Sequence, residues 1–154
     1  LEAMRRLCGQ MRCRGARVLF DPSPWFAGRV AVDAMQALWE EVDCLSATQD
    51  ELAAWEEGAD CQALASAVLA RGVAQVAIKR GGQGAYYAER GGARGHVAVE
   101  RVENANTVGA GDSFNGRLVH GLCQGEALAP AVAAAAGAAA GVVRGGRGVL
   151  GLVS

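Results

Sequence analysis

The sequence predicts an α/β layer fold with a largely parallel sheet, and two observations support this. Short apolar runs typical of buried strands, such as residues 73–78, alternate with longer segments whose apolar residues recur at helical spacing. The chain has 154 residues, of which 51% are hydrophobic, so it is long enough for one ordinary domain with a buried core. Strands that alternate with helices are typical of α/β proteins.

The first part of the chain begins with helical spacing of Met4, Leu7, Cys8 and Met11. A short apolar run then stops at the turn-forming sequence Asp-Pro-Ser-Pro over 21–24. The expected elements are a helix over 1–13, a strand over 17–20, a turn or loop at 21–24, a helix over 30–42, a strand over 43–45, and short helices over 48–55 and 60–71.

In the second part, a buried strand leads into the glycine-rich turn Gly-Gly-Gln-Gly, and a later helix has Phe114, Leu118 and Leu122 on one face. The expected elements are a strand over 73–78, a turn at 81–84, strands over 85–89 and 96–102, a loop at 107–111, and helices over 112–123 and 128–143.

Charge and composition exclude several classes of function. The 15 basic and 16 acidic residues give a net charge of −1, which argues against a nucleic-acid binder or a protein of anionic membrane surfaces. No apolar run approaches a membrane span, and no apolar stretch follows the arginines near the start as in a signal peptide. The five cysteines are odd in number and lack zinc-site spacing, so we expect a reduced, cytoplasmic protein.

The most informative segment, residues 106–116, reads Asn-Thr-Val-Gly-Ala-Gly-Asp-Ser-Phe-Asn-Gly. Its small residues come just before a helix, where backbone N–H groups and the positive end of the helix dipole can hold an anion. Asp112 beside such a cradle can accept a proton from a hydroxyl group that attacks phosphorus. It can equally be the N-cap of its helix, and spacing alone does not separate the two interpretations.

This segment resembles the C-terminal signature of the ribokinase-like (PfkB) carbohydrate kinases, Asp-Thr-x-Gly-Ala-Gly-Asp-x-Phe. Further segments resemble the family in the same order: the strand ending in Asp-Pro (18–22), the Asn-x-x-Glu motif (48–51), the strand and Gly-x-x-Gly turn (76–85), and the closing Ala-rich helix (131–146). The resemblance covers nearly the whole chain. It implies a ribokinase-like three-layer α/β/α fold with a mostly parallel sheet.

The resemblance also implies roles for individual residues. Asp112 matches the family's catalytic base, and its anion hole matches Gly109, Ala110 and Gly111. Glu51 matches an acid that organises magnesium through water. The positions that match ATP-binding residues are Lys79, Arg80, Gly81, Gly82, Gln83, Gly84, Gly111 and Gly146. The implied cofactors are ATP and Mg²⁺.

The sequence departs from the family pattern at several positions. Thr48 replaces the usual Asn, and Thr48 with Glu51 also has the spacing of a capping box, so the structural and the magnesium interpretations of Glu51 both stay open. Asn106 and Val108 differ at positions that help some members bind a monovalent cation, which argues against a potassium site. Arg117 stands where the family has a small residue.

Members of the family are much longer. We therefore expect residues 1–154 to be a single partial domain, the C-terminal nucleotide-binding and catalytic half, without the N-terminal half and lid. On its own the chain is expected to be inactive on sugars.

The expected function is ATP-dependent phosphorylation of a primary hydroxyl of a sugar or sugar acid, as in 2-keto-3-deoxygluconate kinases and fructokinases. The partners are then ATP and a small molecule rather than nucleic acid or a membrane, and a homodimer of the complete protein is compatible with this expectation. One alternative is a catalytically idle nucleotide-binding or interaction module with the same fold. The other is a nicotinamide-dependent oxidoreductase domain, which NAD rather than ATP would protect from heat.

Overall fold

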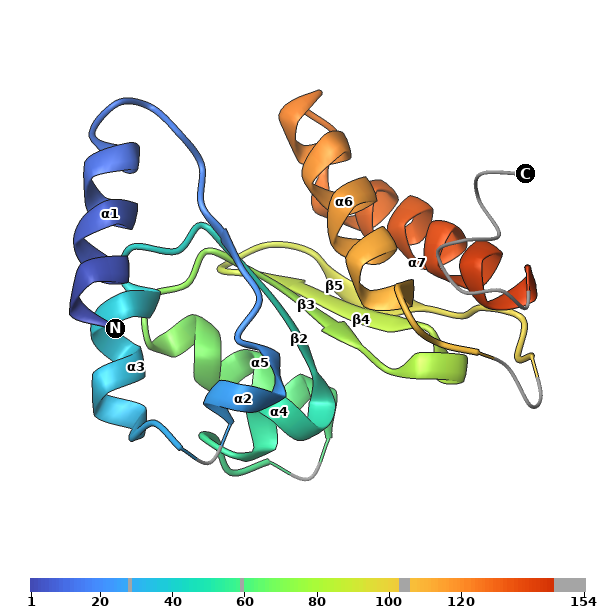
Figure 1. The fold of residues 1–154 in the computed structure, drawn as a ribbon, viewed down its shortest axis with the longest axis horizontal. Helices are drawn as coiled ribbons and strands as arrows, with labels where there is room; N and C mark the ends of the chain where they lie inside the picture. Colours follow the sequence, from blue (N-terminus) through green and yellow to red (C-terminus); the bar gives the residue numbers. More distant parts are fainter. Residues whose placement is uncertain (28, 59, 103–105, 146–154) are drawn as a thin grey trace. The chain divides into compact units, whose positions relative to one another are not determined.

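The computed structural model describes residues 1–27, 29–58, 60–102 and 106–145 (Figure 1). The chain forms two compact units. The first unit comprises Leu1–Ile78 and Tyr87–Ala93, and the second comprises Lys79–Tyr86 and Arg94–Ser154. Each unit is described below by itself.

A five-stranded mixed sheet has the strand order β1-β2-β3-β4-β5, with the strands at Leu19–Phe20, Cys44–Thr48, Gln75–Lys79, Ala85–Glu89 and Arg94–Val97. β1 and β2 are parallel, with Leu19 opposite Cys44. β3 and β4 are joined by a tight turn that the Arg80 amide closes on the Gly84 carbonyl at 2.8 Å. The predicted α/β class is therefore confirmed, with a sheet that is parallel where it starts and hairpin-linked where it ends.

The helices of the first unit are α1 (Glu2–Arg12), α2 (Ser23–Phe26), α3 (Val32–Trp39), α4 (Gln49–Ala53) and α5 (Cys61–Ala70). The fully buried side chains of α3, α4 and α5 form the core of this unit together with Leu45 of β2, whereas α1 and α2 have no buried residue. The rings of Trp39 and Trp55 meet edge to face at 6.0 Å between centroids, a favourable aromatic geometry. Asp60 caps α5, because its carboxylate accepts the Ala63 amide at 2.9 Å.

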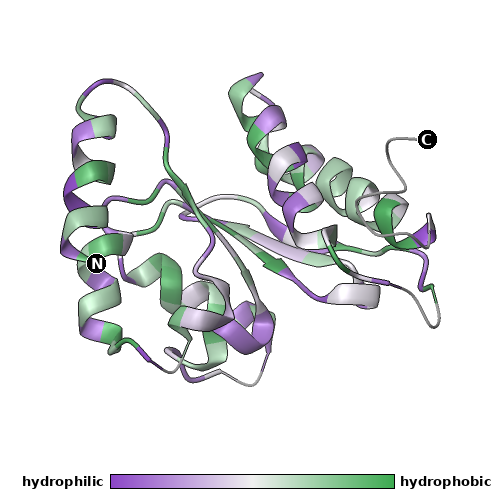
Figure 2. Cartoon of the chain, viewed as in Figure 1, coloured by the Kyte–Doolittle hydropathy of each residue, from purple (hydrophilic) through white to green (hydrophobic). Residues whose placement is uncertain are grey.

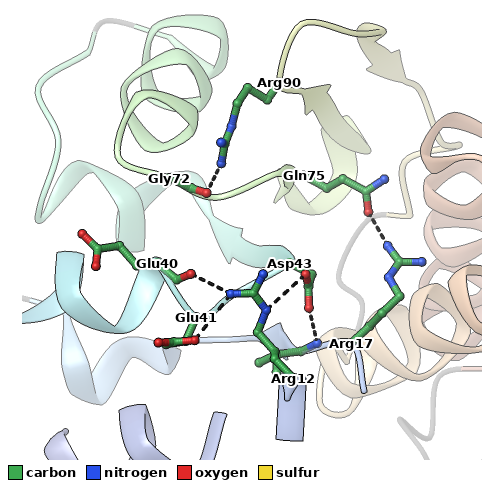
Figure 3. A network of polar contacts seen from close by, with 9 residues as sticks. Arg12, Arg17, Glu40, Glu41, Asp43, Gly72, Gln75 and Arg90 are labelled. Atoms are coloured by element: carbon green, nitrogen blue, oxygen red, sulfur yellow. Dashed lines mark hydrogen bonds and ion pairs between the residues drawn. The ribbon is translucent and has the colours of Figure 1, made fainter. Parts of the chain in front are cut away.

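Polar contacts tie together the ends of the strands in the first unit (Figure 3). The Asp43 carboxylate, just before β2, accepts the Val18 amide at 2.7 Å and lies 3.6 Å from Nε of Arg12. Arg12 also donates to the Glu40 carbonyl at 2.9 Å. These bonds satisfy backbone groups where the chain enters the sheet, which explains why charged residues stand beside buried strands.

Three elements differ from the sequence-based expectation, each for a local reason. The predicted turn at 21–24 runs into α2, because proline is tolerated in the first turn of a helix. β2 continues to Thr48 rather than ending at Leu45, since Ser46 and Ala47 are fully buried in the middle of the sheet. β5 begins at Arg94 and ends at Val97 instead of running over 96–102. The chain opposite Val97 turns away at Gly84, so later residues have no strand to pair with.

The second unit is built on α6 (Ala110–Cys123) and α7 (Leu128–Arg144), which pack side by side, with α7 also against β5. Phe114, Leu118 and Leu122 are buried, as their spacing predicts. Figure 2 shows α7 pale green along most of its length, whereas α6 alternates between hydrophobic and hydrophilic residues. In the ranges described, no helix combines the length and apolar character needed to cross a membrane.

Candidate functional site

The start of α6 is set by Gly109. This residue is the N-cap and has a left-handed backbone, with φ 83°, a conformation that glycine adopts without strain. The helix therefore begins at Ala110, two residues earlier than the sequence suggests. Asp112 is the third residue of the helix, and no side chain caps this helix end. The interpretation of Asp112 as the N-cap is wrong.

Two backbone amides at this helix start donate to no acceptor among the described residues. Ala110 donates to the Thr107 carbonyl at 3.1 Å, and Ser113 donates to the Gly109 carbonyl at 2.9 Å. Within the described residues, the amides of Gly111 and Asp112 have no hydrogen-bond acceptor. Gly111 and Asp112 are exposed, and a Cβ on Gly111 would meet nothing within 4 Å. Free N–H groups at the positive end of a 14-residue helix favour an anion.

The side chain of Asp112 is exposed and has no hydrogen-bond partner in the described part of the chain. Its helix is nevertheless held firmly, because Phe114 and Leu118 on the opposite face are buried. The carboxylate thus lies at the edge of the unused amides on an anchored helix. An accessible carboxylate in this position can accept a proton from a hydroxyl group near a bound anion.

The loop before α6 has its own local structure. The Asn106 side chain accepts the Val108 amide at 3.0 Å, which is an Asx turn. Val108 is 69% exposed, an unusual degree for valine. Asn106 therefore shapes the loop through its side chain. The prediction that this segment lacks a monovalent-cation site stays a prediction.

The glycine-rich turn Gly81–Gln83 is a single turn of 3-10 helix between β3 and β4. The Gln83 amide donates to the Arg80 carbonyl, and the Gly84 amide to the Gly81 carbonyl, both at 3.0 Å. Gly84 has φ 87°, and a Cβ there would overlap the Val97 carbonyl oxygen. Only glycine fits this position, so the turn packs tightly against the end of β5.

Three features of this turn were not predicted from the sequence. The ring nitrogen Nε2 of His96 lies 2.7 Å from the Gln83 carbonyl oxygen. The aliphatic stem of Arg101 covers Gly82, with its Cγ 3.2 Å from where a Cβ would be. Nε of Arg80 is buried and has no partner within the described residues. The hairpin that joins these residues was predictable, but their side-chain contacts leave no pattern in the sequence.

Glu51, in the first unit, forms the capping box with Thr48. The Thr48 amide donates to Oε2 of Glu51 at 2.6 Å, and the Glu51 amide donates to the Thr48 hydroxyl at 3.2 Å. The side chain is only 5% exposed. The structural interpretation of this motif is confirmed, and the magnesium role of Glu51 stays a prediction.

The predicted site residues thus fall into separate groups. Gly109, Ala110, Gly111 and Asp112 come together at the start of α6 in the second unit. Lys79 to Gly84 form the end of β3 and the following turn. Gly146, predicted to contact ATP, lies outside the described residues. No group of three or more His, Cys, Asp or Glu side chains suited to a metal ion occurs in the part of the chain that the structure describes.

Amides at a helix N-terminus that have no acceptor among the described residues can bind an anion such as a phosphate group. The family model of the pfkB carbohydrate kinases matches residues 1–149. The chain belongs to this family.

Solved structures of bacterial proteins agree with this assignment. A PfkB protein from Polaromonas sp. JS666 is 27% identical, with a TM-score of 0.75 over 99% of this chain and 51% of its own. A putative ribokinase II from E. coli, solved with ATP and Mg²⁺, is 26% identical, with a TM-score of 0.75 over 92% of this chain and 46% of its own. Aminoimidazole riboside kinase from Salmonella enterica is 25% identical, with a TM-score of 0.74 over 88% of this chain and 49% of its own.

The chain spans about half the length of the solved structures that it matches. No curated protein sequence matches it significantly.

Proposed function

We propose that this chain is the nucleotide-binding and catalytic half of an ATP-dependent kinase that phosphorylates a primary hydroxyl of a sugar or sugar acid. The observation that carries the proposal is the start of α6, where the amides of Gly111 and Asp112 have no acceptor among the described residues and the Asp112 carboxylate is exposed. Membership of the pfkB family supports the same reaction.

In this proposal Asp112 is the general base. It takes the proton from the acceptor hydroxyl while that oxygen forms a bond to the γ-phosphorus of ATP. The bond from this phosphorus to the bridging oxygen breaks, and ADP leaves. Asp112 suits the role because its carboxylate is not engaged by any described residue and is therefore free to accept a proton.

The anion hole of Gly109, Ala110 and Gly111 would neutralise charge on the transferred phosphoryl group. Preorganised amides of this kind often give the largest catalytic contribution, because they need no reorganisation during the reaction. The amide of Ala110 already donates to Thr107. We therefore assign the direct contacts to Gly111 and to the amide of Asp112, with Ala110 and Gly109 shaping the turn.

ATP would lie along Lys79 to Gly84, where Gly81, Gly82 and Gln83 are exposed. Magnesium neutralises phosphate charge when bound. In this proposal a magnesium ion would be held mainly by phosphates and water. Glu51 already gives Oε2 to the Thr48 amide and is nearly buried, so it would act through water.

Residues 79–81 and 107–115 resemble those of 2-keto-3-deoxygluconate kinases and fructokinases. This resemblance suggests that the acceptor is a sugar or sugar acid of the kind that those enzymes phosphorylate. A supply of ATP and five cysteines that form no disulfide both suit the cytoplasm. In this proposal the chain is a single partial domain. Residues of an N-terminal half would hold most of the phosphoryl acceptor.

Calorimetric titration of the purified chain tests the nucleotide half of the proposal, with Mg-ATP, Mg-ADP and NAD as separate ligands. Binding of Mg-ATP and Mg-ADP but not NAD is expected. Binding of NAD alone would contradict the proposal and favour a nicotinamide-dependent enzyme.

The catalytic half is tested with the natural polypeptide that contains these residues, by following ADP release with a panel of sugars and sugar acids. Sugar-dependent ADP release is expected. Nucleotide binding without transfer to any acceptor would favour the idle module instead.

A further inference from the structure

One side chain outside the predicted site contacts the glycine-rich turn. His96, on β5, has its Nε2 atom 2.7 Å from the carbonyl oxygen of Gln83. A carbonyl only accepts hydrogen bonds, so Nε2 must carry the hydrogen and the imidazole donates. Both residues belong to the second unit.

This bond differs from the others in the turn. The carbonyls of Arg80, Gly81 and Gly84 all accept amides from within the turn itself. The Gln83 carbonyl instead accepts from a side chain on a neighbouring strand. His96 is therefore the polar side-chain link between the turn and β5 in the described residues.

Two packing contacts act beside this bond. Gly84 lies directly against the Val97 carbonyl, and the stem of Arg101 covers Gly82. Neither packing contact is directional. The peptide group between Gln83 and Gly84 is held by two hydrogen bonds, one from its own amide to the Gly81 carbonyl at 3.0 Å and one from His96 to its carbonyl oxygen. Hydrogen bonds are directional, and His96 holds the carbonyl end of this group.

We propose that His96 is a positioning residue for nucleotide binding, holding the peptide between Gln83 and Gly84 in the orientation that the bound nucleotide requires. This proposal rests on the proposed function, in which ATP lies along Lys79 to Gly84. His96 acts through the turn and makes no contact with the nucleotide. Without this donor only the bond from the Gly84 amide to the Gly81 carbonyl holds the peptide group, so its orientation is less restricted and binding must select the competent one.

The test measures the dissociation constant of Mg-ATP for the chain with three variants. His96→Leu removes the donor, and His96→Gln restores an N–H group of similar reach. The matched control is His120→Leu at the chain's other histidine, which is exposed in the last turn of α6. Losing one hydrogen bond of this kind corresponds to about a 3- to 10-fold weaker affinity.

We expect His96→Leu to weaken Mg-ATP binding by this factor, His96→Gln to recover most of it, and His120→Leu to leave it unchanged. The ¹⁵N NMR spectrum of the unmodified chain should show His96 with its hydrogen on Nε2. Thermal unfolding of each variant reports whether it is folded, and the glutamine variant keeps the test valid if the leucine variant is not.

Unchanged affinity in His96→Leu would overturn the proposal, and so would an equal loss in His120→Leu or a failure of His96→Gln to recover binding. If the unmodified chain binds no Mg-ATP, the proposed function fails and the positioning role falls with it. The ¹⁵N signal of His96 would then still report the hydrogen bond, which separates the two failures.

Discussion

The guanidinium of Arg117 donates to the Glu126 carboxylate at 3.0 Å, directly over the backbone of Gly121. A Cβ on Gly121 would lie 2.7 Å from Oε2 of Glu126 and 2.8 Å from Nη1 of Arg117. A bulky charge at position 117, where the family has a small residue, is thus accommodated by a partner in the loop before α7 and by a glycine beneath the pair. The three residues form one coupled group.

This coupling predicts non-additive effects on stability. Gly121→Ala should be nearly neutral or destabilising in the unmodified chain, because the gain in helix propensity is offset by displacement of the ion pair. In a chain with Arg117→Ala and Glu126→Ala, the same change should stabilise by about 0.5 to 1 kcal/mol, as alanine for glycine does in an open helix. Urea unfolding measures the change in the free energy of unfolding caused by Gly121→Ala in each background. Equal effects of Gly121→Ala in the two backgrounds would contradict the coupling.

Gly84→Ala should destabilise the second unit. Position 84 has φ 87°, and the added Cβ would overlap the Val97 carbonyl oxygen, so the substitution combines backbone strain with a steric clash. The expected cost is about 2 to 4 kcal/mol in urea unfolding. Gly137→Ala is the control, because its Cβ meets nothing within 4 Å in the interior of α7. That variant should gain about 0.5 to 1 kcal/mol. Equal stability of the two variants would contradict the geometry of the turn.

Burial raises the pKa of the Cys44 thiol to about 12, from an ordinary value of 9.0. The unfolded chain therefore loses this proton at lower pH than the folded chain. The contribution of this thiol to the free energy of unfolding is fully present below pH 9. It is lost as the pH rises toward 12, by about 1.4 kcal/mol per pH unit. The stability difference between the unmodified chain and Cys44→Ala should shrink at that rate above pH 9. A difference independent of pH between 8 and 11 would argue against a buried thiol.

Much of the fold could be predicted because its signals are local. The apolar spacing of α6 and the N-cap of α5 are both written in short stretches of sequence. The extent of β2 could not be predicted, since burial of Ser46 depends on neighbouring strands rather than on its own residue type. The end of β5 likewise depends on where its partner turns away, at Gly84.

The candidate site was predictable in its location but not in its details. The glycines and Asp112 are recognisable in sequence, but the start of the helix depends on the left-handed conformation of Gly109. This conformation makes Asp112 the third helical residue and removes its interpretation as a cap. The occupation of the Ala110 amide by Thr107 and the contact of His96 with Gln83 are tertiary details, which no local pattern indicates.

The most direct measurement is the turnover number of Asp112→Asn in the natural polypeptide that contains these residues, together with its affinity for Mg-ATP. Asparagine keeps the size and helix position of the residue but cannot accept the hydroxyl proton. We expect unchanged Mg-ATP affinity and a turnover number lower by about 10²- to 10⁴-fold. An undiminished turnover number would remove Asp112 from the mechanism and contradict the account.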